Sequence, residues 1–67
     1  MSVAKISEIT SISKKSFDDA IETGVKRACK TLRNVKSAWV KNKRVLVEKD
    51  RIVGYQVNLK VTFILKD

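Results

Sequence analysis

Few residues in this chain could carry chemistry, and they do not form a catalytic set. The 67 residues include no histidine, a single cysteine (Cys29) and two glycines, Gly24 and Gly54. The sequence therefore shows no nucleophile with a neighbouring base, no cluster of zinc ligands and no glycine-rich loop that could cradle a phosphate. We predict a binding protein and not an enzyme.

The remaining residues of chemical interest are basic and aromatic. The formal net charge is +8, the densest basic patch is Lys41-Asn42-Lys43-Arg44, and the only tryptophan, Trp39, lies just before this patch. An excess of positive charge attracts anions in general. Basic residues are spread along the chain and are not massed in a tail. We therefore expect no specific nucleic-acid partner; binding to nucleic acid, if seen, should be non-specific and vanish as salt rises.

Length and composition predict one small domain over residues 1–67. A domain of about 60 residues is marginally stable alone, and a lone cysteine closes no internal disulfide. Oligomerisation is the remaining common route to stability. The first residues lack the apolar core of a signal peptide, no apolar run approaches the ~20 residues that span a bilayer, and an unpaired cysteine fits a reducing compartment. We predict a cytoplasmic homo-oligomer without a membrane partner.

The most informative element is a long alternating segment, Val53–Leu65. Its odd-numbered positions are apolar: Val53, Tyr55, Val57, Leu59, Val61, Phe63 and Leu65. Its opposite face carries polar residues: Gln56, Asn58, Lys60 and Thr62. Because side chains alternate along a strand, this segment predicts a strand of ~13 residues, or about 43 Å at ~3.3 Å per residue. One helix cannot cover so long an apolar strip, so we expect it to be partly exposed or covered by another subunit.

A helix is predicted over about Lys14–Arg33. Its apolar and small residues have the i, i+3, i+4, i+7 spacing of one helical face. Acidic residues occupy its start and basic residues its end, as the helix dipole favours. Ser13 is the expected N-cap, with Ser16 as the second choice. Gly24 on the apolar face indicates close approach to a sheet, and we expect Cys29, at the edge of this face, to be a small buried side chain.

Two further strands complete the pattern. Val3–Ile12 is rich in Ile, Ser and Thr, and a bulge could explain why its alternation shifts between Ile6 and Ile9. Val35–Val47 forms a hairpin with the last strand through the polar loop Glu48-Lys49-Asp50-Arg51. With the right-handed crossover rule, these elements predict an α+β fold with β-α-β-β order. Its three-stranded antiparallel sheet, in the order 1-3-2, wraps around one helix and leaves its other face bare.

Several short pieces at fixed spacing resemble the dodecin family. They are Glu8-Ile9, Ser13, Ala20-Ile21, Arg27-Ala28, Thr31-Leu32, Val40, Tyr55-Gln56-Val57 and Phe63-Ile64-Leu65. The resemblance covers nearly the whole chain without a gap. It implies a dodecin-like fold, a hollow shell of twelve copies (a homododecamer), and a storage protein for a flavin such as riboflavin or flavin mononucleotide (FMN).

The resemblance also implies site residues. In the family, a tryptophan early in the second strand stacks on the isoalloxazine ring, and a glutamine after a tyrosine in the third strand hydrogen-bonds the ring. Gln56 matches the glutamine, but Ser37 stands at the tryptophan's position and Trp39 lies two residues further on. Alternation places Ser37 and Trp39 on one face, about 6.6 Å apart. Trp39 could therefore reach a displaced flavin, or simply pack at a subunit contact.

We accordingly expect a flavin site that is weakened by Ser37. The basic excess would suit a ligand phosphate, with Arg44 or Lys43 as the candidate partner. Some members of the family also bind coenzyme A, which makes coenzyme A a second candidate ligand. The alternative function is a dodecin-like shell without flavin, which binds another small anion such as coenzyme A or acts as a scaffold.

Overall fold

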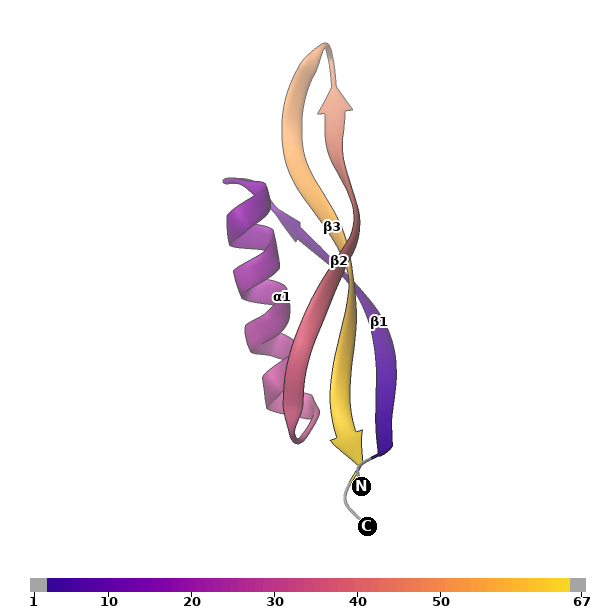
Figure 1. Cartoon of the computed structure of the whole chain (residues 1–67). Coiled ribbons are helices and arrows are strands. Elements are labelled where there is room, and N and C mark those ends of the chain that lie inside the picture. Colours follow the sequence, from indigo (N-terminus) through magenta and orange to yellow (C-terminus); the bar gives the residue numbers. More distant parts are fainter. Residues whose placement is uncertain (1–2, 66–67) are drawn as a thin grey trace.

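The computed structural model describes residues 3–65 and has the predicted β-α-β-β order. Its elements are β1 (Val3–Ser13), α1 (Phe17–Thr31), β2 (Val35–Glu48) and β3 (Arg51–Leu65). The strands form one antiparallel sheet in the order β1-β3-β2, and α1 lies along one face of this sheet (Figure 1). The predicted α+β fold, with the last strand in the middle, is confirmed.

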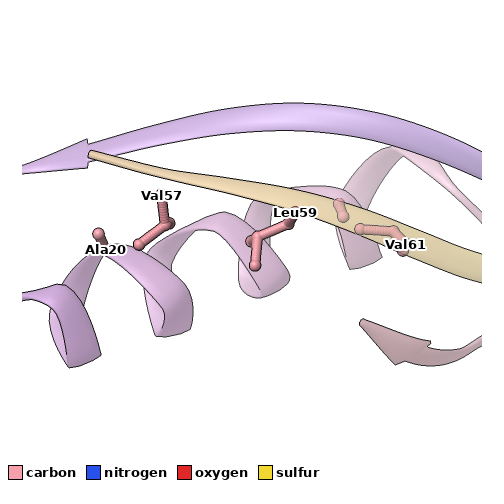
Figure 2. Packing of buried hydrophobic residues seen from close by; sticks show 5 residues of the cluster. Ala20, Val57, Leu59 and Val61 are labelled. Atoms are coloured by element: carbon pink, nitrogen blue, oxygen red, sulfur yellow. The ribbon is translucent and has the colours of Figure 1, made fainter. Parts of the chain in front are cut away.

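The core lies between α1 and the central strand. Val57, Leu59 and Val61 of β3 are fully buried, and Ala20 and Ala28 of α1 are buried against them (Figure 2). The helix contributes only small buried residues, which lets it lie close to the sheet. The odd-numbered face of β3 is therefore the helix-facing side at these three positions, as its alternation predicts.

Gly24 lies where α1 comes very close to the sheet. A methyl group added at this position would lie 2.9 Å from Leu59 Cδ1 and 3.0 Å from Ser11 Cβ. Carbon atoms normally settle at about 3.5–4.0 Å, so a side chain here would push α1 away from β1 and β3. The role predicted for this glycine, close approach of the helix to the sheet, is confirmed.

The start of α1 differs from the prediction. Ser16, not Ser13, is the N-cap, and its hydroxyl accepts a hydrogen bond from the backbone N–H of Asp19 at 3.0 Å. Ser13 is instead the buried last residue of β1. Its hydroxyl accepts from the backbone N–H of Lys15 at 2.9 Å and donates to Asp19 Oδ2 at 2.6 Å. Ser13 therefore stabilises the turn between β1 and α1.

The helix is also shorter than Lys14–Arg33. Residues 14 and 15 belong to the turn around Ser13, and the extended backbone of Leu32 ends the helix. The predicted burial of Cys29 is wrong, because its thiol-bearing side chain is exposed. Ala28 is buried toward the sheet, and successive helical residues turn by about 100°, so Cys29 points away from the sheet.

β1 runs without the expected bulge, because its pairing with β3 is continuous along the whole strand. Ile9 lies opposite Leu59 and faces α1, whereas Ile6 and Ile12 point to the other face of the sheet and are exposed. The shift in the apolar pattern therefore has a different cause: β1 carries apolar residues on both of its faces.

The hairpin between β2 and β3 is tighter than the predicted four-residue loop. Its turn consists of Lys49 and Asp50, whose φ angles are 50° and 62°. Positive φ at both central residues is typical of a type I′ turn, which matches the twist of the flanking strands. The ladder between β2 and β3 also has three register shifts, between Val35/Ser37, Val40/Asn42 and Leu46/Val47.

The far end of this hairpin extends beyond α1 (Figure 1), and the described part of the chain measures 51 × 18 × 14 Å. Several apolar side chains near this end are exposed: Val45, Val47, Ile52 and Val53. Of the apolar strip on β3, the two end residues Val53 and Leu65 are exposed in the single chain, as expected for a strip that is longer than the helix. Within residues 3–65, α1 is too short and too polar to cross a membrane.

Candidate functional site

The candidate site lies on the sheet face that points away from α1, which we call the outer face. Odd-numbered residues of β3 pack against the helix, so alternation turns the even-numbered ones outward. Four of these are polar and half-buried: Gln56, Asn58, Lys60 and Thr62. Across residues 3–65, no three His, Cys, Asp or Glu side chains gather as metal ligands would. The chemistry available on this face is hydrogen bonding, positive charge and aromatic stacking.

Gln56 and Arg44 are brought together on the outer face. They are direct partners in the ladder between β2 and β3, which places their Cβ atoms about 4.5–5.5 Å apart. The amide of Gln56 can both donate and accept hydrogen bonds. The guanidinium of Arg44 adds a permanent positive charge and a planar set of donors. This pair places hydrogen-bonding groups and a positive charge side by side on the outer face.

An apolar surface beside Gln56 was not predicted from the sequence. An added methyl group at Gly54 would lie 3.2 Å from Leu46 Cδ1 and 3.6 Å from Ile12 Cγ2, so these two side chains cover the glycine. Ile12 is also the partner of Gln56 on the β1 side. The signal that could have found this surface is the pairing register, which places Ile12 next to Gln56 once β1 is aligned with β3.

Trp39 and Ser37 form a second group on the outer face. Their ladder partners are Lys60 and Thr62, both outward-facing positions of β3, which confirms that the two residues share a face. Trp39 is 65% exposed, and Lys60 Nζ lies 5.4 Å from the centroid of its ring. This is cation–π distance. The indole therefore offers a flat, accessible surface on which another ring can stack.

The two groups lie well apart within one chain. Gln56 is separated from Lys60, the partner of Trp39, by four positions along β3, or about 13 Å at ~3.3 Å per residue. The polar row between them includes Asn58, whose side-chain oxygen accepts a hydrogen bond from Thr10 Oγ1 at 3.0 Å. A ligand that contacts both Gln56 and Trp39 must either span this distance or receive one of them from a second chain.

The two basic candidates for a ligand phosphate point to opposite faces. Lys43 is the ladder partner of the buried Val57 and so lies on the helix side, where its Nζ is 5.4 Å from the centroid of the Phe17 ring. A separate hollow on that side is lined in part by Phe17, Lys43 and Tyr55, and the two rings meet edge to face with centroids 5.1 Å apart. Of these two basic residues, only Arg44 lies beside Gln56 on the outer face.

Comparison with known proteins identifies the family to which this chain belongs. The family model described as Dodecin matches residues 3–66. The dodecin from Streptomyces davaonensis is similar with a TM-score of 0.92 and 30% identity, covering 98% of this chain and 97% of that chain. The dodecin from Streptomyces coelicolor has a TM-score of 0.92 and 29% identity, covering 98% and 94%. A mutant of the T. thermophilus dodecin has a TM-score of 0.92 and 31% identity, covering 100% of both chains. A search of curated proteins found no match.

Proposed function

Because this chain belongs to the dodecin family, we propose that twelve copies form a shell that binds and stores a flavin, either riboflavin or FMN. The family membership and the shared fold support a small dodecin-type binding protein. In this proposal the protein holds its ligand without transforming it, since the outer face offers binding groups and no nucleophile–base pair.

The observation that carries the proposal is the placement of four residues on one exposed sheet face. Gln56 and Arg44 sit side by side, and Trp39 and Ser37 share the same face. In the bound state the amide of Gln56 would hydrogen-bond the polar edge of the isoalloxazine ring, and Arg44 would attract the phosphate of FMN. The exposed indole of Trp39 would stack on the ring, which adds about 0.5–1.5 kcal/mol beyond surface burial.

Assembly would bring the separated groups together. The ~13 Å between Gln56 and the partner of Trp39 exceeds what one ring contact can bridge, so a complete site would take these two residues from different chains. The exposed apolar side chains of the hairpin, among them Val47 and Ile52, would then be covered by neighbouring copies. Ser37 has no ring to offer, and we therefore expect weaker flavin binding than a tryptophan at this position would give.

Titration of flavin-free protein with riboflavin should quench the emission of Trp39, the only tryptophan. Gln56→Ala should weaken binding by about 0.5–1.5 kcal/mol, the net value of one hydrogen bond. Trp39→Ala should also weaken it, and Ser37→Trp should strengthen it by about 0.5–1.5 kcal/mol through stacking. Riboflavin's own fluorescence reports binding in the variant that lacks tryptophan.

The matched control uses the two neighbouring basic residues that face opposite ways. Arg44→Ala should lower affinity for FMN while leaving affinity for riboflavin unchanged, because only FMN carries a phosphate. Lys43→Ala removes the same charge from the helix side and should change neither affinity. Tight riboflavin binding that survives Trp39→Ala would place the ring away from β2 and contradict the assigned site.

A second candidate function is a shell without flavin. The observation that favours it is Ser37, which removes the expected stacking ring while Arg44 and its positive charge remain. Such a shell would hold another small anion, such as coenzyme A, or act as a scaffold. The two functions differ in colour: a flavin-loaded protein purified from cells is yellow, whereas a shell with another anion is colourless and still sediments as a large particle.

A further inference from the structure

Basic residues are spread along the chain, but acidic residues are absent from one long segment, so the net excess of positive charge lies in that segment. Residues 23–47 carry eight lysines and arginines and no acidic residue, whereas the rest of the chain carries seven residues of each sign. Half of these eight charges lie on β2: Lys36, Lys41, Lys43 and Arg44. The other half follow one another along the second half of α1 and just after its end: Lys26, Arg27, Lys30 and Arg33.

These helix charges form an exposed surface of their own. Lys26, Arg27 and Lys30, together with Thr23, line a hollow on α1, and all four residues are exposed. We call these three basic residues the basic helix face. The acidic residues of α1 lie in its first half, at Asp18, Asp19 and Glu22, so the helix is divided by charge along its length.

The basic helix face has no carboxylate partner in the described part of the chain. The only ion pair found within residues 3–65 joins Lys41 to Glu8 on the sheet, at 3.5 Å. Three cations within five consecutive helical residues repel one another unless an anion lies between them. An external anion would therefore gain the attraction that no internal carboxylate supplies.

The residues that α1 buries and exposes indicate which kind of anion the basic helix face can bind. A basic helix that binds a lipid surface also inserts an apolar face into the bilayer, but the apolar face of α1 is used by the core, where Ala20, Gly24 and Ala28 are buried. The exposed side of α1 also lacks aromatic residues, on which single-stranded bases would stack. Both features favour a rigid array of phosphates, as in a nucleic-acid duplex.

We propose that the basic helix face docks onto the phosphate backbone of duplex nucleic acid without reading its sequence. The segment from Lys26 to Lys30 covers about 6 Å of helix axis, and each strand of B-DNA presents a phosphate about every 3.4 Å along its axis. Two such intervals, which join three successive phosphates over about 6.8 Å, are close to the spacing of these side chains. This docking surface is separate from the outer face of the sheet, and it does not depend on flavin binding.

The test compares two variants with the same net charge. The first variant removes the three charges of the basic helix face, by Lys26→Gln, Arg27→Gln and Lys30→Gln. The second variant removes three exposed charges from the rest of the chain, where the two signs balance, by Lys5→Gln, Lys14→Gln and Lys49→Gln. Glutamine is a good helix former, so α1 should be retained. Fluorescence anisotropy of a labelled duplex of about 20 base pairs is measured between about 50 and 200 mM salt. Circular dichroism and sedimentation check that both variants keep the fold and the assembly.

We expect the first variant to bind the duplex at least about tenfold more weakly at low salt, and its plot of log affinity against log salt to be shallower by about two to three. The second variant should remain within about threefold of the wild type, because its charges lie elsewhere. An equal loss in both variants would show only a general charge effect and would overturn the proposal. So would binding to phosphatidylserine vesicles, but not to the duplex, that is lost in the first variant.

Discussion

Leu59→Ala should lower the free energy of unfolding by about 2–5 kcal/mol, the usual cost of cutting a buried leucine back to alanine. Leu59 is fully buried between α1 and the sheet, and its Cδ1 lies against Gly24. The shortened side chain would leave a cavity, and the small buried residues of α1 are too short to fill it. Denaturant unfolding at a fixed protein concentration measures the change, because the stability of an oligomer depends on concentration.

Lys60→Ala is the matched control, since it changes the next residue of the same strand on the opposite face. Lys60 is half-buried and contacts the ring of Trp39, an interaction of about 0.5–1 kcal/mol at an exposed site. Its removal should therefore change stability by less than about 1 kcal/mol. Similar losses in the two variants would mean that the helix does not lie on the odd-numbered face of β3.

Gly24→Val should destabilise the protein by about 1–3 kcal/mol, as expected for added atoms in a packed core. Even the first added carbon would meet Leu59 Cδ1 at 2.9 Å and Ser11 Cβ at 3.0 Å. The two methyl groups of valine reach further toward β1, so α1 must move away from the sheet. This loss outweighs the gain in helix propensity over glycine, which is below about 1 kcal/mol.

Thr23→Val places the same side chain one residue earlier, where α1 is exposed. Its effect should stay within about 0.5 kcal/mol, as for most surface changes. Thermal unfolding of both variants at equal protein concentration measures the difference. A stability of Gly24→Val equal to that of the wild type would show that the helix does not need to approach the sheet as closely as the structure shows.

The fold could be predicted because its central strand has an unambiguous pattern. The alternation from Val53 to Leu65 determines which face of β3 is buried, and the charges and apolar spacing of residues 14–33 identify one helix. With a hairpin and a right-handed crossover, few topologies remain, and the observed order β1-β3-β2 is the one that places the most apolar strand in the middle.

The errors occurred where several residues compete for one role. Ser13 and Ser16 can both cap a helix. Only the turn geometry shows that the Ser13 hydroxyl donates to the Asp19 carboxylate, while the Ser16 hydroxyl accepts from the Asp19 backbone N–H and is the N-cap. In β1 the apolar residues divide between two faces, which imitates a bulge in the sequence. Cys29 follows the buried Ala28 in sequence, but the helix turns by about 100° per residue, which takes the side chain of Cys29 out of the buried face.

The candidate site was predicted in part. Alternation alone places Ser37 and Trp39 on one face, and the register confirms this. Strand pairing was needed to see that Arg44 stands beside Gln56 whereas Trp39 stands far along the strand. The apolar cover of Ile12 and Leu46 over Gly54 also depends on register. Contacts between chains are not encoded in any local pattern, and for that reason the assembled site stays a prediction.

The most direct test of the proposed function is sedimentation velocity of the protein with riboflavin, recorded both in the protein's ultraviolet band and in the flavin's visible band. We predict a single fast boundary with a mass roughly twelve times the 7.6 kDa of one chain, in which the visible absorbance moves with the protein. A slowly sedimenting monomer at micromolar concentration would contradict the shell. A fast boundary that leaves all of the riboflavin behind would contradict flavin storage and favour the shell that holds another anion.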